Sequence, residues 1–354
     1  MKPTWLFLDT TSAKRLGIQY PDVYFSAEYG VVVQQSDKAA WELAVCTFPD
    51  QSKCYYCYLK RPVSDVSAGH CAADLVSPYG YCGPWSEGPV SEKHWFEFRQ
   101  GFLEHALKKR YIAEFIRLSP LLNEEQSAFR SASSGLTIWS HQTTVAVDLS
   151  RGVESYMQRS SKKHRRAVNK ALRLGYTASI SPATHGDLEN FIPMYLHTMK
   201  RTEAHSYYLF GDSYFAALVK ELRGRLHMVS VTLDGKYAAA SLYIVWGELM
   251  HYHLGASYEE FLGDGVNDLV HHAAARWGTE NGIKLQHLGG GRKDGDSLFS
   301  FKNSVGDVSL TWYLAKGVID QSTYDKLVLE RAKKLGKAVH EVEVSGFFPA
   351  YRCQ

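Results

Sequence analysis

Residues His287–Gly306, HLGGGRKDGDSLFSFKNSVG, combine several residue types that can do chemistry. Three consecutive glycines precede a basic pair, and a lone lysine, Lys302, follows between Phe301 and Asn303. A lysine ammonium fixed in an aromatic setting can stabilise negative charge that develops on an oxygen atom during a reaction. The same residue could instead be a surface lysine at the end of a strand. The sequence alone leaves both interpretations open.

The three glycines do not match a nucleotide-binding P-loop. That motif places four residues between its first glycine and a following Gly-Lys-Ser/Thr, which this stretch lacks. We therefore interpret Gly289–Gly291 as a sharp turn of the backbone after the short strand KLQHL, close to bound substrate.

A second chemically distinctive stretch is strongly basic. Between Ser155 and Gly186 there is no acidic residue, although the whole chain has a net charge of only +3. The basic residues in this stretch are Arg159, Lys162, Lys163, Arg165, Arg166, Lys170 and Arg173. A helix face exposed to solvent and a binding site for a polyanion are about equally compatible with this pattern.

The cysteines predict neither a disulfide framework nor a zinc site. They stand at positions 46, 54, 57, 71, 82 and 353, too few and too scattered for a disulfide scaffold. Cys54 and Cys57 have C-x-x-C spacing but lie in a strand-like run, where residues three apart point to opposite faces. No second pair completes a zinc site, so we interpret them as ordinary strand cysteines.

The histidines offer no catalytic triad. No nucleophile-elbow or catalytic-cysteine motif is present. His271 and His272 are adjacent on a predicted helix, and we interpret them as ordinary helix residues. His251 and His253 share one face of a predicted strand, where one could relay a proton, although packed histidines are the simpler interpretation. We expect neither a metal nor a bound cofactor.

The composition is that of a globular protein with room for two domains. The chain has 354 residues, of which 45% are hydrophobic and 22% charged. Its apolar runs are too short to span a bilayer, and the N-terminal run is too short for the core of a secretory signal. We therefore expect a cytoplasmic protein without membrane insertion.

The first half mixes predicted strands with one helix. Strand-like patterns occur in VYFSAEYGVVVQ, AWELAVCTF, CYYCYL and LTIWSHQTTVAVDL, and a helix is expected around HWFEFRQGFLEHALKKR. DLVSPYGYCGPW is a turn-rich loop that carries Tyr79 and Tyr81. Such a loop can form the wall of a binding site or simply pack on the surface.

The second half predicts an α+β unit. The basic helix and a helix around DLENFIPMYLHTMKRTE lead into three antiparallel strands within Leu226–Ser257, with tight turns at Asp234-Gly235 and Gly247-Glu248. The helix GVNDLVHHAAARWGTENG and the strand KLQHL follow. STYDKLVLERAKKLG then predicts an amphipathic helix, and VHEVEV a strand.

This order of elements resembles the core of the GNAT acyltransferases. In that family a glycine loop between strand and helix holds the pyrophosphate of acyl-CoA on its backbone amides. The corresponding window here is Glu260–Gly265, EFLGDG, with Gly263 and Gly265 in register. Glu260 and Asp264 bring two carboxylates to this loop, which oppose the binding of a pyrophosphate.

Several segments together resemble the Fem-type aminoacyltransferases, GNAT-related enzymes that build peptidoglycan cross-bridges from aminoacyl-tRNA, and their relatives in natural-product pathways. The matching segments are SPYGYCGP, SKKHRRAVNKALRLGY, YLHTMKRTEAHSYY, MHYHLGAS, HLGGGRKDGDSLFSFKNSVG and the final FFPAYR. No single segment is diagnostic, but their order and spacing are fairly specific.

The resemblance implies a fold and a set of site residues. It implies an α+β chain of two tandem GNAT-like domains, each a mixed, largely antiparallel sheet flanked by helices. The domains would span residues 1–150 and 151–318, with residues 319–354 packing back on the first. Lys302 would stabilise the oxyanion. The acceptor would contact Tyr79, Tyr81, Arg201, Tyr207 and Tyr252, and tRNA would contact Lys162, Lys163, Arg165, Arg166 and Lys170.

The leading hypothesis is a tRNA-dependent aminoacyltransferase that forms an amide with an amine acceptor. The acceptor could be a peptidoglycan precursor or a small natural-product intermediate, because the first half shows no residues that would grip a nucleotide-sugar peptide. The alternative is an acyl-CoA-dependent N-acyltransferase. An RNA-binding module and a sugar- or peptide-binding protein have less support, since no RNA-stacking motif is visible. No DNA partner is expected.

Overall fold

The structure of the chain is a computed structural model that describes residues 2–64, 72–293 and 295–353. The chain forms two compact units. The first holds the chain up to His141 and resumes at Trp312, and the second runs from Gln142 to Thr311. The boundaries fall within strands β7 (Thr137–Asp148) and β13 (Val308–Val318), a few residues before the expected positions 150 and 318. Sequence patterns give no signal there because no linker separates the units.

The first unit contains a mixed sheet with strand order β1-β2-β3-β4-β6-β13, in which β5 also pairs with β3. Its strands are β1 (Thr4–Leu8), β2 (Ala40–Thr47), β3 (Lys53–Pro62), β4 (Ala73–Val76), β5 (Pro84–Glu87), β6 (Tyr111–Arg117) and the second part of β13. Its helices are α1 (Thr10–Arg15), α2 (Ala27–Asp37), α3 (Glu92–Lys108), α4 (Ser127–Ala132), α11 (Gln321–Leu335), α12 (Val339–Glu343), and the 3-10 turns η1 (Val23–Phe25), η2 (Pro120–Leu122) and η5 (Ala350–Arg352).

The second unit contains the other mixed sheet, with strand order β7-β12-β11-β10-β9-β8. Its further strands are β8 (Thr177–Pro182), β9 (Leu226–Leu233), β10 (Lys236–Trp246), β11 (Leu249–Ser257) and β12 (Leu285–Gly289). Its helices are α5 (Gly152–Arg159), α6 (Lys162–Arg173), α7 (His185–Arg201), α8 (Asp212–Glu221), α9 (Val266–Glu280), α10 (Ser297–Val305), and the 3-10 turns η3 (Ser206–Tyr208) and η4 (Glu259–Asp264).

The two sheets repeat one pattern of pairing. In each, four strands pair antiparallel, then one parallel pair follows, β4 with β6 in the first unit and β11 with β12 in the second. A helix lies between the members of each parallel pair along the chain, α3 in the first unit and α9 in the second, because parallel neighbours need a crossover. A final antiparallel strand completes each sheet.

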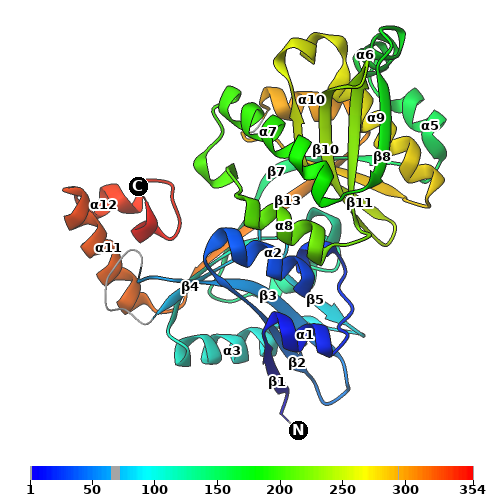
Figure 1. Ribbon diagram of the computed structural model, residues 1–354. Coiled ribbons are helices and arrows are strands. Elements are labelled where there is room, and N and C mark those ends of the chain that lie inside the picture. Colours follow the sequence, from blue (N-terminus) through cyan, green and yellow to red (C-terminus); the bar gives the residue numbers. More distant parts are fainter. Residues whose placement is uncertain (1, 65–71, 294, 354) are drawn as a thin grey trace. The chain divides into compact units, whose positions relative to one another are not determined.

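Each sheet is covered by helices that bury its apolar residues. In the second unit α9 packs on one face, over a cluster that includes Tyr243, Met250 and Val270, whereas α7 contacts β10 and β11 from the other side (Figure 1). In the first unit Trp95, Phe98 and Phe102 of α3 are nearly inaccessible to solvent. Buried side chains of this size dominate the stability of such cores.

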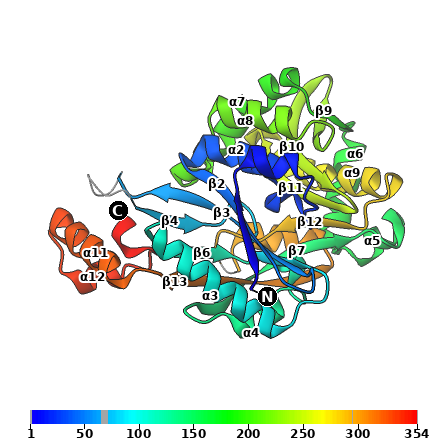
Figure 2. The ribbon, with the colours of Figure 1, turned by 90° about the horizontal axis from the view of Figure 1, so that it is seen from below.

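The C-terminal segment is part of the first unit. α11 and α12 lie next to the C-terminus (Figure 2). Tyr324, Leu327 and Val328 of α11 pack with Ile112 of β6. The buried carboxylate of Asp74 accepts hydrogen bonds from the Arg352 guanidinium and from the Tyr351 hydroxyl, the latter at 3.2 Å. These polar contacts join the last residues of the chain to β4.

The expected strand in VYFSAEYGVVVQ is wrong, because these residues form η1 and α2. Ser26 begins α2 as its N-cap, where its hydroxyl accepts a hydrogen bond from the Tyr29 amide at 3.1 Å. A side chain at Gly30 would meet the ring of Trp41 at 2.8 Å, so the helix packs closely on β2. Burial of one helix stripe thus outweighs the preference of three consecutive valines for strands.

The expected strand in VHEVEV is also wrong, because residues 339–343 form the short helix α12. The Glu341 carboxylate accepts a hydrogen bond from the Ala338 amide at 2.7 Å and so stabilises the first turn. Only Val342 is buried, whereas Val344 is 77% exposed. The alternation of the sequence therefore does not reflect two faces of a sheet. The other expected helices and strands are present.

Two features are absent from the described residues. None of their helices combines the length and the apolar character needed to cross a membrane. No group of three or more His, Cys, Asp or Glu residues in the described ranges is arranged to hold a metal ion. Cys71 lies outside the described residues, and Cys54 and Cys57 lie on β3 as expected.

Candidate functional site

The parallel strands β11 and β12 pair only at their beginnings. Leu249–His251 pair with Leu285–His287, after which β11 stays paired with β10 and β12 with β7. The register of β10 and β11 shifts between Leu242 and Tyr243, which is a β-bulge next to Tyr252. Bulges of this kind redirect side chains near active sites. The place where the strands part, between Tyr252 and Leu288, is called the β11–β12 divergence.

Lys302 reaches this divergence from α10. Its Nζ atom donates a hydrogen bond to the Gly290 carbonyl oxygen at 2.8 Å and lies 5.5 Å from the centre of the Tyr252 ring. Lys302 lies in helix α10, and only 6% of its surface is exposed. The interpretation of Lys302 as a surface lysine at the end of a strand is therefore wrong. Burial lowers the pKa of Lys302 to about 8, and most molecules therefore carry an ammonium at neutral pH.

The three glycines position both the Gly290 carbonyl and the start of α10. Gly289 has φ +75°, and a Cβ atom on Gly291 would lie 2.4 Å from a carboxylate oxygen of Asp296. Asp296 caps α10 and accepts hydrogen bonds from the amides of Arg292, Lys293 and Phe299 at 2.7, 3.0 and 2.7 Å. The three amides thus bind the Asp296 carboxylate of the same loop. This arrangement fits a structural turn rather than a phosphate-binding loop.

The pKa of Asp296 reflects this arrangement. Partial burial acts to raise it, but the three donating amides stabilise the charged form, so the pKa of Asp296 is lowered overall. The ionised carboxylate in turn favours the charged form of Lys302 and opposes part of the effect of burial. The loop therefore helps to keep a buried ammonium at the divergence.

Tyr252 lies across the backbone of its own strand. A Cβ atom at Gly255 would be 1.9 Å from the Tyr252 hydroxyl, so only glycine leaves room for this ring. The ring packs against His271 at 4.8 Å and Tyr243 at 5.6 Å. Burial raises the pKa of Tyr252 to about 12, so the phenol is neutral and can act as a hydrogen-bond donor.

His271 is a neighbour of the site that the sequence did not identify. Its Nδ1 atom is 2.7 Å from the Tyr243 hydroxyl, and burial lowers the pKa of His271 to about 3. A neutral imidazole is thereby held against the ring of Tyr252. The adjacent pair His271 and His272 does not show in the sequence which of the two lies beside Tyr252. The packing of α9 on β10 and β11 places His271 there.

The expected acceptor residues divide between the two units. Arg201 ends α7, and the next residue, Thr202, accepts a hydrogen bond from Arg292 of the glycine loop at 2.8 Å. The Nε atom of Arg201 is buried and makes no hydrogen bond within the described ranges, so it can donate to a ligand. Tyr207 is 37% exposed in η3. Arg201, Tyr207 and Tyr252 thus belong to the second unit.

Tyr79 and Tyr81 belong to the first unit. They lie in the loop after β4, where Gly80 has φ +102° and approaches the ring of Tyr24 so closely that a Cβ atom would lie 2.7 Å away. The Tyr81 ring packs edge-on against Trp312 at 5.2 Å. The loop is therefore well packed, with Tyr79 and Tyr81 partly exposed.

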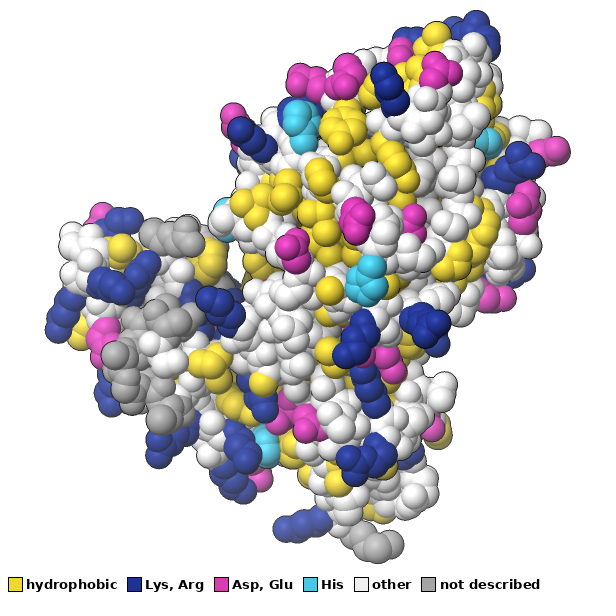
Figure 3. All heavy atoms as spheres, viewed as in Figure 1, with side chains coloured by type: hydrophobic (Ala, Val, Ile, Leu, Met, Phe, Trp, Pro, Cys, Tyr) yellow, Lys and Arg dark blue, Asp and Glu magenta, His cyan; other side chains and the backbone are white. Residues whose placement is uncertain are grey.

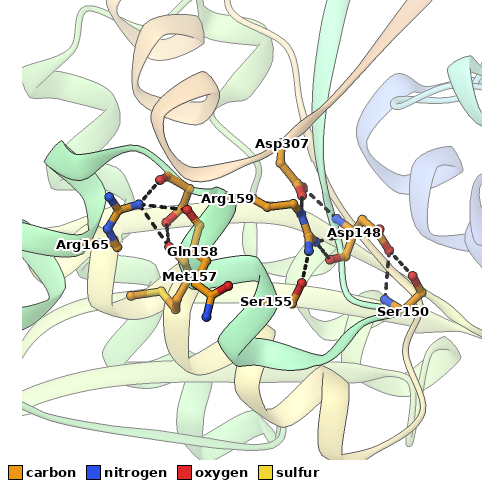
Figure 4. A network of polar contacts seen from close by, with 9 residues as sticks. Asp148, Ser150, Ser155, Met157, Gln158, Arg159, Arg165 and Asp307 are labelled. Carbon is orange, nitrogen blue, oxygen red and sulfur yellow. Dashed lines mark hydrogen bonds and ion pairs between the residues drawn. The ribbon is translucent and has the colours of Figure 1, made fainter.

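The basic helix α6 separates into exposed and internally bound side chains. Lys162, Lys163 and Arg166 are exposed and form no ion pair in the described part of the chain. Figure 3 shows Lys and Arg side chains that project into solvent where α6 forms the edge of the second unit. Arg165 instead donates to the carbonyl oxygens of Met157, Gln158 and Ser160 at the end of α5 (Figure 4). Arg165 therefore stabilises the α5–α6 junction.

Arg159 is bound internally as well. Its guanidinium contacts Ser155 and the carboxylate of Asp307, and it donates to the Asp148 carbonyl oxygen at 2.7 Å (Figure 4). The basic stretch thus contains two kinds of residue that sequence cannot separate. Some neutralise carbonyl groups and carboxylates inside the unit, and others face solvent.

Helix α6 covers the N-terminus of α9, where the glycine loop lies. Gly265 has φ +85°, and a Cβ atom there would lie 2.4 Å from the backbone oxygen of Ala167 in α6. Asp264 pairs with Lys170 at 3.1 Å and accepts a hydrogen bond from Tyr176 at 2.9 Å. Lys170 also donates to the Gly263 carbonyl oxygen at 2.8 Å. The loop is therefore closed by contacts within the chain.

A buried polar chain completes the closure. The His164 ring on α6 lies 2.7 Å from the Asp268 carboxylate in the first turn of α9, and 2.6 Å from the Tyr156 hydroxyl on α5. A carboxylate at this position already compensates the positive end of the α9 dipole. The N-terminus of α9 thus has little capacity left for an anionic ligand.

Comparison with known families identifies the type of domain that carries these residues. Residues 158–302 match the model of the acetyltransferase (GNAT) domain family, and the matched range includes α6, the β11–β12 divergence and Lys302. No curated protein sequence matches the chain significantly.

Solved structures are similar to the chain over most of its length. The crystal structure of FemX is 13% identical, covers 91% of this chain and 99% of its own, and has a TM-score of 0.69. The C-terminal domain of a putative lysylphosphatidylglycerol synthetase from Agrobacterium fabrum is 15% identical and has a TM-score of 0.54. The match covers 89% of this chain and 93% of that one. L-PGS from Bacillus licheniformis is 14% identical, and the match covers 82% of this chain and 86% of that one, with a TM-score of 0.53.

At these identities the likeness establishes the fold. The expected class, α+β with GNAT-like units that each contain a mixed, largely antiparallel sheet flanked by helices, is confirmed.

Proposed function

We propose that the chain transfers an aminoacyl group from charged tRNA to an amine and so forms an amide. The amine nitrogen attacks the carbonyl carbon of the ester, the bond to the ribose oxygen breaks, and the ribose hydroxyl leaves with a proton. The ester is already activated, so the protein has to align the substrates and stabilise the oxyanion. Lys302, a buried ammonium held by the Gly290 carbonyl at the β11–β12 divergence, is suited to the second task.

The observation that carries the choice of donor is the closure of the α9 N-terminus by α6. A helix N-terminus is the usual place for a phosphate group in a fold of this kind. Here Gly265 abuts Ala167, and Asp264 and Asp268 bring negative charge to the same place. The opposite, outward side of α6 presents Lys162, Lys163 and Arg166 to solvent. This combination disfavours acyl-CoA and favours a larger polyanion.

The solved neighbours support an aminoacyl group in particular. Two of them carry the names lysylphosphatidylglycerol synthetase and L-PGS, and the former name describes a product that contains lysine. The acceptor in the present chain would be an amine, with Arg201, Tyr207 and Tyr252 of the second unit as its proposed contacts. The roles of Tyr79 and Tyr81 of the first unit stay predictions. A peptidoglycan precursor and a natural-product intermediate both fit this description.

The donor is tested by supplying purified protein and an amine acceptor with either charged tRNA or the matching acyl-CoA. We expect amide formation from charged tRNA only, measured by mass spectrometry of the acceptor. Ribonuclease treatment of the tRNA before the reaction should abolish the product. Product formation that survives ribonuclease would exclude the proposed donor.

The contribution of α6 is tested by replacing Lys162, Lys163 and Arg166 with alanine together. We expect KM for charged tRNA to rise by about tenfold or more, and the slope of log affinity against log salt to become shallower by roughly 2 to 3, because each lost phosphate contact removes close to one released counterion. The matched control replaces Lys220, Arg223 and Lys236, three exposed basic residues of the same unit, and removes the same charge.

Arg165 is omitted from this variant because its loss would disturb the α5–α6 junction. If the control variant and the α6 variant change KM equally, the effect comes from net charge and α6 is not the tRNA site.

The second candidate is an acyl-CoA-dependent N-acyltransferase. It is favoured by the match of residues 158–302 to the acetyltransferase (GNAT) domain. This candidate requires α6 to leave the N-terminus of α9, so that Gly263 and Gly265 become accessible. Product from acyl-CoA, with none from charged tRNA, would support it.

A further inference from the structure

Two buried thiols lie in contact in the first unit. The sulfur atoms of Cys57 on β3 and Cys82 in the loop after β4 are 3.0 Å apart, and both side chains are fully buried. The S–S bond of a disulfide measures about 2.05 Å, so the sulfurs would have to approach by only about 1 Å. Neither residue belongs to the site around Lys302.

The backbone holds both residues in place. Cys57 lies within β3 and pairs in register with Leu43 of β2. The Cys82 amide donates to the Arg117 carbonyl oxygen at 2.7 Å, and the Cys82 carbonyl accepts from the Ser119 amide at 2.9 Å and the Gln126 side chain at 3.2 Å. The proximity of the sulfurs is therefore a property of the sheet and not of a loosely held loop.

Two other thiols of this unit, Cys46 and Cys54, provide an internal contrast. Cys46 and Cys54 face each other in register on β2 and β3, yet their sulfurs make no hydrogen bond within the described part of the chain. The C-x-x-C spacing pairs Cys54 with Cys57, but the fold pairs Cys57 with Cys82, 25 residues further along the chain. Sequence spacing thus does not identify the two thiols in contact.

We propose that Cys57 and Cys82 are an oxidation site at which a peroxide closes an intramolecular disulfide. One thiol attacks a peroxide oxygen, which gives a sulfenic acid and one molecule of water. The second thiol attacks the sulfenic sulfur, the S–S bond forms and a second molecule of water leaves. The two electrons lost by the thiols reduce the peroxide, and a dithiol reductant reverses the reaction by exchange.

Cys82 is the better candidate for the first attack. It follows the partly exposed residues Tyr79, Gly80 and Tyr81 in a loop, whereas Cys57 lies within β3, so we place the approach of the peroxide on the side of Cys82. Burial raises the pKa of Cys57 and makes its thiolate scarce, which disfavours Cys57 as the first nucleophile. The disulfide would join the Tyr79–Tyr81 loop covalently to β3.

The experiment exposes the full chain to hydrogen peroxide, removes the peroxide with catalase, blocks remaining thiols after denaturation and maps the peptides by mass spectrometry. We expect a linked peptide that joins Cys57 to Cys82, disappears on treatment with dithiothreitol, and raises the midpoint of thermal unfolding. The double variant Cys46→Ser, Cys54→Ser should form the same link. In Cys57→Ser, a sulfenic acid should instead be trapped at Cys82 by dimedone.

Three results would overturn the proposal. Both thiols could stay fully available to the blocking reagent while methionine sulfoxide shows that peroxide acted. Cys82 could join a cysteine other than Cys57, including Cys71. Cys46 and Cys54 could join as fast as Cys57 and Cys82, which would remove the selectivity that the 3.0 Å contact predicts. The unmodified chain decides among these outcomes even if a variant fails to fold.

Discussion

Replacing Lys302 with alanine is expected to lower turnover at least about a hundredfold, the usual cost of removing one oxyanion donor. The ammonium is buried, lies over the Tyr252 ring and is held by the Gly290 carbonyl, so water cannot easily take its place. KM for charged tRNA should change little, because the proposed interaction strengthens only as charge develops on the carbonyl oxygen.

The pH dependence separates this role from a structural one. The charged form of Lys302 is the active form, and its pKa is about 8, so kcat/KM should fall as the pH rises through about 8. In Lys302→Arg this decline should disappear, because arginine stays charged throughout the range, even if turnover is low. Lys293→Ala removes an exposed lysine of the same loop and serves as the matched control.

Near-normal turnover in Lys302→Ala would remove this residue from the mechanism. A loss that is equal in Lys302→Ala and Lys293→Ala would point to a general disturbance of the loop. Circular dichroism and thermal unfolding of both variants show whether the second unit keeps its fold.

The second large effect expected is a loss of stability in mild acid. Three buried histidines of the second unit, His253, His271 and His287, are held neutral by burial, which lowers the pKa of His253 and His271 to about 3 and that of His287 well below its usual value. Unfolding exposes them with an ordinary pKa near 6.5. The unfolded state therefore binds more protons below that pH.

The sign of the effect follows from these pKa values. The contribution of the neutral histidines is fully present above about pH 6.5 and is lost as the pH falls from there toward the folded pKa values. Each group costs up to about 1.4 kcal/mol per pH unit in this window, so the three together should lower the free energy of unfolding by about 5 kcal/mol between pH 6.5 and pH 5. This is comparable to the whole stability of many domains.

Urea unfolding at several pH values measures this loss. Hydrogen exchange in peptides from β11 and α9 assigns it to the second unit. In His253→Gln the slope of unfolding free energy against pH should become shallower, because one of the contributing groups is removed. His185→Gln changes an exposed histidine and should leave the slope as it is. A stability that stays constant between pH 6.5 and pH 5 would contradict the prediction.

Local patterns predicted most elements of the second unit. The meander β9–β10–β11 follows from alternation broken by tight turns at Asp234-Gly235 and Gly247-Glu248, and α9 follows from apolar spacing that ends near Gly282. These signals are local, because each turn and each amphipathic face is encoded within a few neighbouring residues. The same reasoning failed for α2, where packing of Gly30 against Trp41 decides the conformation.

The roles of individual basic residues needed tertiary structure. Lys162 and Arg165 differ by three positions on one helix, yet the first faces solvent and the second holds the end of α5. The sequence shows that both residues are positively charged, but it does not show which groups they contact. The partners of Arg165 are backbone carbonyl oxygens, which every residue supplies. The same limit applies to Lys170, whose partner Asp264 is far along the chain.

By itself, the sequence determined that the chain is α+β, that Lys302 follows a glycine turn, and that one helix is basic without compensating acids. Only the tertiary structure decided that Lys302 is buried over Tyr252, that α6 closes the N-terminus of α9, and that Cys57 meets Cys82. The reason is physical. Residue type and spacing fix local conformation, whereas burial and the pKa shifts that it causes arise when segments distant in sequence pack together.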